Sequence, residues 1–214
     1  MKKATKKDIE FIRDRFLENY SDAVTELDYK NDYELLIAII LSAQCTDKRV
    51  NIITPALFDK YPSTNELEVA QLEDVKNLLK SCSFFNNKAK NIIKMAQVVE
   101  ELHGGEIPHD TKQLMKLAGV GNKTANVFMI EADGANLMAV DTHVFRVSHR
   151  LGLSDAKTVE QTEKQLVKKL KDDLHIFHQA MVLFGRYICK AVKPDCDKCF
   201  IKEVCKTKET FRVG

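Results

Sequence analysis

A chain of 214 residues is long enough for one domain or two small ones, and 44% hydrophobic with 30% charged residues is the composition of a globular protein with a sizeable core. Its most apolar run, 35–41, is far shorter than the roughly 20 residues of a membrane-spanning helix, and no apolar segment of a secretory signal follows the lysines of 1–7. A net charge of +2 does not by itself indicate nucleic-acid binding. These features argue against a membrane-spanning or secreted protein. We therefore expect a cytoplasmic protein, whose six cysteines serve a metal site or catalysis rather than disulfides.

Helical periodicity runs through the whole chain. Apolar side chains recur at helical spacing around Ile12 and Phe16, and the stretch 33–43 is nearly all apolar, as in a helix that is buried on every side. Ser63 and Thr158 each begin a capping box at the start of a later helix. No stretch alternates in period two for any length. The sequence therefore predicts an all-α fold of about ten helices.

The sequence LAGVGNKTA at 117–125 indicates a tight turn between two helices. We expect the first helix to begin near Asp110 and the second to run from about Asn122 to Ala132. Two glycines let the backbone turn sharply, and the N–H groups at the start of the second helix can bind phosphate oxygens. This is the pattern of a helix-hairpin-helix, although a plain corner between helices fits the turn equally well. The predicted DNA contacts of this hairpin are Gly119, Val120, Gly121 and Thr124.

Lys123 lies in the first turn of the second hairpin helix, where a positive charge opposes the helix dipole. A lysine is usually avoided at such a position unless it has a use. One use is as a nucleophile, which requires the neutral amine. The other is as a phosphate contact or an exposed charge. The residue and its position leave both interpretations open.

Asp141 follows an extended apolar segment in the stretch AVDTHVFRV, 139–147, and precedes another predicted helix. An aspartate at this position caps the helix and contributes about 1 kcal/mol to its stability. A carboxylate held by backbone N–H groups is also suited to stabilise a developing positive charge. The two roles are compatible with each other.

Four of the six cysteines lie within 17 residues of the C-terminal region, in the pattern C-x6-C-x2-C-x5-C. Four thiolates at such spacing can hold a zinc ion or a 4Fe–4S cluster. Zinc sites usually have two close cysteine pairs, whereas only one such pair is present here and the first gap is wide. The pattern therefore favours the cluster over zinc. The predicted ligands are Cys189, Cys196, Cys199 and Cys205, while Cys45 and Cys82 are expected to be small buried apolar residues.

Positive charge is concentrated around these cysteines. From Arg186 to Gly214, eight Lys or Arg stand against four Asp or Glu, a net charge of +4. Lys193 and Lys198 alternate with the cysteines and are predicted to contact phosphates. A solvated basic tail is the simpler interpretation of the charge alone. Lys88, Lys90 and Lys94 are expected on a solvated helix face rather than on DNA.

Taken together, these segments resemble the endonuclease III family. The matching motifs are LSAQCTD at 41–47, LAGVGNKTA at 117–125, AVDTHVFRV at 139–147, FGRYIC at 184–189 and the cysteine loop. They cover nearly the whole chain in the family's order. The resemblance implies a helix-hairpin-helix glycosylase fold in two domains, with a DNA cleft between them. These are a six-helix bundle at 25–135, with the hairpin at about 110–133, and a discontinuous iron–sulfur domain formed by 1–24 and 136–214.

The resemblance also implies the activity, that of a DNA N-glycosylase and DNA-(apurinic or apyrimidinic site) lyase. Lys123 would attack C1′ of a damaged nucleotide, release the base through a Schiff base and cleave the strand 3′ to the lesion by β-elimination, with Asp141 assisting. Gln44 would fill the gap in the duplex, and Phe84 would wedge into the opposite strand. The expected substrates are oxidised pyrimidines, such as thymine glycol, and abasic sites in double-stranded DNA. We expect a monomer that works at the nucleoid.

The sequence departs from the family's pattern at three sites, one of which is a pair of residues. Ala118 stands where proline is frequent, Asn122 where a basic residue is frequent, and Ser83-Phe84 where a Gly-Leu pair is usual. None of them is the lysine or the aspartate. Two alternatives follow. One is a monofunctional glycosylase of the same superfamily, for an alkylated or mismatched base; Lys123, and the end of the sequence nine residues after Cys205, argue against an adenine glycosylase. The other is a DNA-binding module without enzymatic activity.

Overall fold

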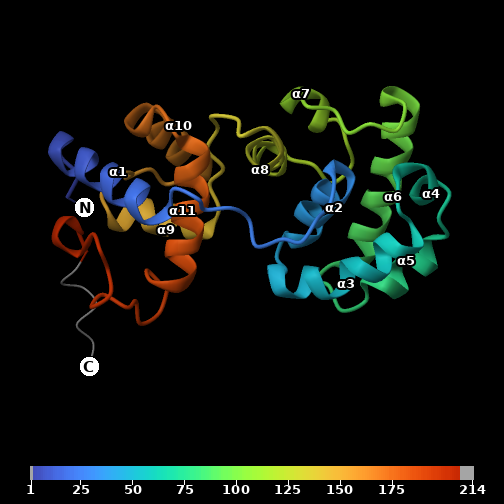
Figure 1. Ribbon diagram of the computed structural model, residues 1–214, viewed down its shortest axis with the longest axis horizontal. Helices are drawn as coiled ribbons and strands as arrows, with labels where there is room; N and C mark the ends of the chain where they lie inside the picture. The colour runs from blue at the N-terminus through green and yellow to red at the C-terminus, as the bar shows by residue number, and fades with distance from the viewer. Residues whose placement is uncertain (1, 208–214) are drawn as a thin grey trace. The chain divides into compact units, whose positions relative to one another are not determined.

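A computed structural model describes residues 2–207, so Lys208 and Arg212 of the predicted basic tail lie outside the described residues. Within this range the chain forms eleven α-helices and one short 3-10 helix, with no strand (Figure 1). The predicted all-α fold is confirmed. No helix in the described range is both long and apolar enough to cross a membrane. The elements are α1 (Lys6–Tyr20), α2 (Asp32–Ser42), α3 (Asp47–Lys60), α4 (Thr64–Glu68), α5 (Leu72–Leu79), α6 (Phe85–His103), α7 (Thr111–Leu114), α8 (Asn122–Asp133), α9 (Thr142–Arg150), α10 (Val159–Leu170), α11 (Leu174–Tyr187) and η1 (Lys202–Val204).

The chain divides into two compact units, each with its own hydrophobic core. The central unit is Glu26–Asp133 and contains α2 to α8. The terminal unit is formed by the segments on either side, up to Thr25 and from Gly134 onward, and contains α1, α9, α10, α11 and η1. The resemblance implies six helices in the bundle; the central unit has seven, of which α4 and α7 are only five and four residues long.

The core of the central unit is built around α2. Asn31 caps this helix by accepting a hydrogen bond from the backbone N–H of Glu34 (2.9 Å), and every side chain from Tyr33 to Leu41 is buried. The prediction of a helix buried on every side is confirmed. Because α2 packs against α3, α6 and α8, its C-terminal end is held within the unit and leads directly into the motif at 41–47.

The core of the terminal unit joins segments that are far apart in the sequence. The ring of Phe16 on α1 makes edge-to-face contacts with Phe184 on α11 and Phe200 in the cysteine loop, with centroid distances of 5.3 and 5.4 Å. Ile201, next to Phe200, is fully buried. Aromatic pairs of this kind stabilise by about 0.5–1.5 kcal/mol beyond the area they bury. The cysteine loop is therefore anchored to α1 and α11 by apolar packing.

Local capping signals in the sequence correspond to real helix ends. Thr158 caps α10 by accepting from the N–H of Gln161 (3.3 Å), as the capping box predicts. Gly104 ends α6 with a φ of 61°, in the left-handed region that glycine adopts without strain. The capping box at α1, between Thr5 and Asp8, was not predicted.

Candidate active site and DNA-contacting residues

Lys123 lies in the first turn of α8, directly after the hairpin. The carbonyl of Gly121 accepts the N–H of Ala125 (2.9 Å), so Gly121 is the N-cap residue immediately before the helix. The Lys123 side chain is exposed, while Ala125 and Asn126 on the opposite face are buried in the core of the central unit. The helix is thus anchored by one face, and it presents the amine of Lys123 to solvent, where a bound ligand can be reached.

The hairpin that precedes Lys123 is held by its apolar residues. Asp110 caps α7, as predicted, by accepting from the N–H of Gln113 (2.9 Å). The helix itself is shorter than expected, because after Leu114 the chain continues in tight turns to Leu117. Leu117 and Val120 are buried and hold the turn against the core. Because the side chain of Val120 is buried, only its backbone is available for the predicted DNA contact.

The two hairpin glycines differ in backbone conformation and in the space around the Cα atom. Gly119 has a φ of +84°, and a Cβ at this position would lie 3.1 Å from the Cβ of Asn91 on α6. The protein itself therefore requires glycine there. Gly121 has no such φ, and a Cβ would meet nothing within 4 Å. Glycine at 121 keeps the surface at the start of α8 open, beside Lys123.

Asp141 is the N-cap of α9, as the sequence predicts. Its Oδ1 accepts a hydrogen bond from the backbone N–H of Val144 (2.7 Å), and the residue is half-buried. This bond fixes the direction of the carboxylate at the start of the helix. Asp141 belongs to the terminal unit, and Lys123 belongs to the central unit.

Gln44 and Phe84 are exposed and adopt the same unusual backbone conformation. Their φ angles are 55° and 56°, in the left-handed region that residues other than glycine seldom occupy. Gln44 follows α2, and Phe84 is the residue immediately before α6, with 64% of its side chain exposed. Such an exposed side chain of Phe84 adds little to the hydrophobic core. Exposed residues in a strained backbone conformation are typical of contact sites.

The four cysteines of the loop line one pocket, together with Arg150 and Phe184. Burial raises the pKa of the Cys199 thiol to about 11, partly offset by the N–H of Ile201 and reinforced by the neighbouring cysteines. Within residues 2–207, no three Cys, His, Asp or Glu side chains are close enough to hold a single metal ion. Four thiols facing one pocket are nevertheless a donor set that fits a 4Fe–4S cluster, whose iron core offsets the charge of thiolates.

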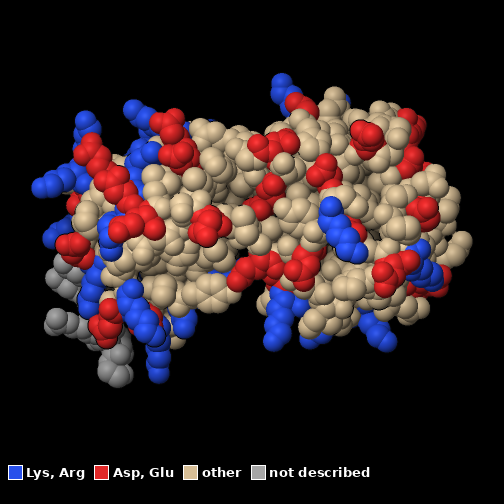
Figure 2. All heavy atoms as spheres, in the orientation of Figure 1, with Lys and Arg blue, Asp and Glu red and all other residues tan. Residues whose placement is uncertain are grey.

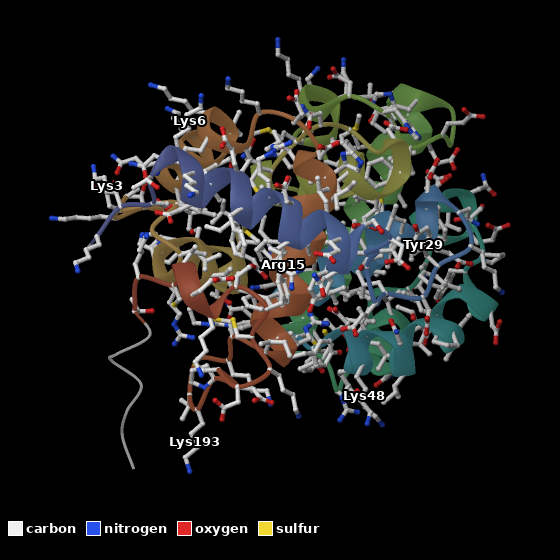
Figure 3. All side chains as sticks on the ribbon, turned by 60° about the vertical axis from the view of Figure 1, so that its left-hand side comes forward. Lys3, Lys6, Arg15, Tyr29, Lys48 and Lys193 are labelled. Atoms are coloured by element: carbon white, nitrogen blue, oxygen red, sulfur yellow. The ribbon has the colours of Figure 1, made fainter. Side chains whose placement is uncertain are left out.

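The predicted basic contacts of the loop are exposed. Lys193 has a φ of 51° and points away from the protein at the edge of the loop (Figure 3). Lys198 forms an exposed ion pair with Asp195 (3.2 Å). Figure 2 shows basic side chains projecting from the loop end of the terminal unit, with acidic side chains among them. The loop therefore offers individual cations rather than an uninterrupted positive surface.

The sequence of this chain is similar to those of known proteins over most of its length. Residues 37–172 match the family model of the HhH-GPD superfamily base excision DNA repair protein. The chain is 46% identical to endonuclease III of Rickettsia felis over 192 residues, which cover 89% of this chain and 90% of the relative. It is 44% identical to endonuclease III of Bacillus subtilis over 202 residues, which cover 94% and 92%. The chain belongs to the endonuclease III family.

A solved structure supports the same assignment for the fold. The chain is similar to a trapped covalent intermediate of endonuclease III with DNA, an estranged-adenine complex, with a TM-score of 0.92 and 42% sequence identity. The match covers 97% of this chain and 98% of that chain. The helix-hairpin-helix glycosylase fold that the family resemblance implies is therefore the fold of this chain.

Sequence reasoning missed an arginine that organises the cysteine loop. Arg150, the last residue of α9, donates to the carbonyl oxygens of Lys190 (2.6 Å) and Ala191 (3.1 Å) and lies 3.3 Å from Sγ of Cys189. Its own carbonyl accepts the N–H of Lys206 (3.0 Å). An arginine in the last turn of a helix looks like a favourable partner of the helix dipole, so the sequence carries no signal of this role.

The expectation that Lys88 lies on a solvated helix face is wrong. Lys88 is only 6% exposed, and its Nζ donates to backbone carbonyls at the end of α2. Cys82 is buried, as expected, but its thiol also contacts this Nζ (3.3 Å), and Cys45 is only partly buried. Lys90 and Lys94 on the same helix are exposed, as predicted. The helical pattern shows which residues share a face of α6, but which face is buried depends on how α2 packs against this helix.

Proposed function

We propose that this protein excises damaged bases with Lys123 as its nucleophile and Asp141 as the assisting carboxylate. As a member of the endonuclease III family, the chain is a DNA N-glycosylase and DNA-(apurinic or apyrimidinic site) lyase that acts in base excision repair on damaged double-stranded DNA. The observation that carries the residue assignment is the exposed Lys123 amine, beside the open backbone of Gly121 at the start of α8.

The proposed reaction begins when the damaged nucleotide leaves the stack. The neutral Nζ of Lys123 attacks C1′, and the bond between C1′ and the base breaks, so the base departs with the bonding electrons and takes up a proton. The nitrogen loses a proton, the sugar ring opens, and C1′ and Nζ form a Schiff base. Removal of a proton from C2′ then expels the 3′ phosphate in a β-elimination, and water releases Lys123 from the sugar fragment.

Asp141 has two proposed tasks in this sequence. It accepts the proton that Lys123 must lose, and it stabilises the positive charge that develops on the sugar. Its bond to the N–H of Val144 uses Oδ1, and a carboxylate can accept further hydrogen bonds. In this proposal the central unit supplies the nucleophile and the terminal unit supplies the carboxylate.

The remaining predicted contacts position the duplex. The hairpin backbone at Gly119, Val120 and Gly121, with the half-buried Thr124, binds phosphate oxygens at the start of α8. Gln44 fills the place of the extruded nucleotide, and Phe84 separates the bases of the opposite strand. Lys193 and Lys198 meet phosphates from the cysteine loop, and their contribution decreases as the salt concentration rises.

The cysteine pocket supports a 4Fe–4S cluster bound by Cys189, Cys196, Cys199 and Cys205. When bound, such a cluster fixes the shape of the surrounding loop, which is the only contribution that the proposal requires of it. Arg150 bonds to the first part of the loop at Lys190, and Phe200 packs its later part against Phe16. We further propose oxidised pyrimidines and abasic sites as the substrates, and the cytoplasm at the nucleoid as the place of action.

Borohydride trapping tests the proposal. The protein is mixed with a duplex that contains one thymine glycol, borohydride is added, and the covalent protein–DNA adduct is measured for the wild type, Lys123→Ala and Lys112→Ala. Lys112 is an exposed lysine on α7 of the same hairpin and serves as the matched control. We expect an adduct with the wild type and Lys112→Ala but not with Lys123→Ala. Release of a free base without an adduct would identify a monofunctional glycosylase, and neither adduct nor base release on several lesions would identify a DNA-binding module.

A further inference from the structure

Lys88 is a buried cation whose three donors are all satisfied by neutral groups. It lies in the first turn of α6, and its Nζ donates to the carbonyl oxygens of Leu41 (2.8 Å) and Ala43 (2.7 Å) and to Sγ of Cys82 (3.3 Å). A lysine ammonium has three N–H donors, so this set accounts for each of them. Within the part of the chain that the structure describes, no carboxylate lies at salt-bridge distance from Lys88.

The position of this cation explains how it is tolerated. Leu41 and Ala43 provide carbonyl oxygens at the C-terminal end of α2, where the helix dipole is negative and a positive charge is favoured. Burying a charged side chain is costly unless hydrogen bonds replace the lost water, and here they do. Without the ammonium, the buried carbonyl of Leu41 and the partly buried carbonyl of Ala43 would lose a charged donor. Lys88 therefore joins the end of α2 to the segment that precedes α6.

Each of these two segments carries one of the exposed residues in a strained conformation. Gln44 follows Ala43 directly, and Phe84 lies two residues after Cys82. The backbone N–H of Lys88 also donates to the carbonyl of Phe84 (3.1 Å). Residues other than glycine keep a left-handed conformation only where the surrounding structure holds them in it. The bonds of Lys88 are placed to do this for both segments at once.

We propose that Lys88 is a positioning residue that holds the Gln44 and Phe84 segments in register, so that both side chains enter damaged DNA together. The inference rests on the insertion roles in the proposed function. It adds that recognition of the lesion depends on a buried lysine that contacts no DNA. It also separates recognition from chemistry, because Lys88 makes no contact with the hairpin or with Lys123 among its bonds to Leu41, Ala43, Cys82 and Phe84.

The test measures insertion directly. A duplex carries a tetrahydrofuran abasic analogue opposite 2-aminopurine, whose fluorescence rises when its base is unstacked. Four proteins are compared: the wild type, Lys88→Met, Lys88→Arg and the exposed-surface control Lys90→Met. We expect Lys88→Met to lose most of the fluorescence rise and to bind this duplex about tenfold more weakly, since hydrogen bonds to charged groups of this kind are strong. Lys88→Arg should keep more of the rise, and Lys90→Met should match the wild type.

A second readout separates positioning from a loss of folding. Borohydride trapping on single-stranded abasic DNA needs no insertion into a duplex, so Lys88→Met should form this adduct as the wild type does. In a Gln44→Ala, Phe84→Ala background, Lys88→Met should weaken duplex binding no further, because its effect acts through those residues. If Lys88→Met does not fold, Lys88→Gln is compared in the same way.

Three outcomes would overturn the inference. The first is a full fluorescence rise with Lys88→Met. The second is that Lys88→Met loses adduct formation on single-stranded DNA as much as binding to duplex DNA, with a lowered melting temperature, and the third is no fluorescence rise with the wild type, which removes the insertion roles themselves. The failure of the proposed function appears differently. In that case the wild type forms no borohydride adduct on any DNA, while the fluorescence comparison, which requires no chemistry, still decides the role of Lys88.

Discussion

The Oδ1 atom of Asp141 accepts a 2.7 Å hydrogen bond from the backbone N–H of Val144, so the proposed catalytic carboxylate is also the cap of α9. Asp141→Asn separates the two roles, because asparagine caps helices as well as aspartate does but carries no charge. We expect the free energy of unfolding to stay within about 0.5 kcal/mol and the single-turnover rate of base release to fall about 100-fold or more. Thermal unfolding and rapid-quench kinetics measure the two effects.

The control for this substitution is Asp141→Ala, which removes the cap together with the charge. It should lower the free energy of unfolding by about 1 kcal/mol in addition to abolishing base release. A full rate of base release in Asp141→Asn would show that the carboxylate serves α9 alone.

The two hairpin glycines should respond differently to alanine. Gly119→Ala should destabilise by about 1–2 kcal/mol, because its φ is +84° and the new Cβ would crowd Asn91. Gly121→Ala should change stability by less than about 1 kcal/mol, since its Cβ meets open space. It should nevertheless weaken DNA binding, because the methyl group stands where a phosphate is proposed to approach. Urea unfolding and fluorescence anisotropy with a lesion duplex test both parts, and wild-type affinity in Gly121→Ala would place the DNA elsewhere.

His109 should make the stability of the central unit depend on pH. Its Nδ1 and Nε2 lie 2.7 and 3.0 Å from the carboxylates of Asp133 and Asp32, and these bonds, chiefly the one to Asp133, raise the pKa of His109 above 6.5. A raised histidine pKa stabilises the fold fully below the unfolded value, and the effect is lost as the pH rises through the folded value. The melting temperature of the wild type should therefore exceed that of His109→Asn at about pH 5.5 by more than at about pH 9.

Asp32→Asn offers a matched control for His109, since it removes one carboxylate and keeps the ring. It should reduce the pH dependence without abolishing it, because Asp133 is the larger cause of the shift. A difference between the wild type and His109→Asn that does not vary with pH would argue against a charged His109 in the folded protein.

Asp8 should contribute stability in the acidic range. Its carboxylate lies 2.7 Å from Nζ of Lys206, and this bond, followed by the bond to the N–H of Thr5, lowers the pKa of Asp8 to about 2. The stabilisation is present above the unfolded pKa of 3.8 and disappears as the pH falls through the folded value. At neutral pH, Asp8→Asn should lower the free energy of unfolding by up to about 2 kcal/mol, and this gap should narrow between about pH 4 and pH 2.

Urea titrations at a series of pH values measure the Asp8 effect. Glu10→Gln is the control, because its ion pair with Lys6 is a long contact of 4.0 Å between exposed side chains and should contribute little. A gap that is constant with pH would mean that Asp8 stabilises α1 only as a cap and not as the partner of Lys206.

The amino-acid sequence alone determined those features that depend on neighbours within one or two helical turns. Periodicity predicted an all-α chain and the buried helix α2, and capping residues such as Asp110, Asp141 and Thr158 marked real helix starts. A cap is a bond between residues three apart, so its signal is contained in the local sequence. The spacing of the four loop cysteines is also a local signal, and the four side chains line one pocket as the spacing predicts.

The tertiary structure decided what depends on the packing of distant segments. Lys88 is buried because the end of α2 lies against the start of α6, Arg150 holds a loop 40 residues further along the chain, and Phe200 packs on Phe16. The positive φ of Gly119 and its packing on Asn91 explain why this position must be glycine, while Gly121 is under neither constraint. Burial and long-range hydrogen bonds arise from which surfaces meet, and no pattern within a single helix contains that information.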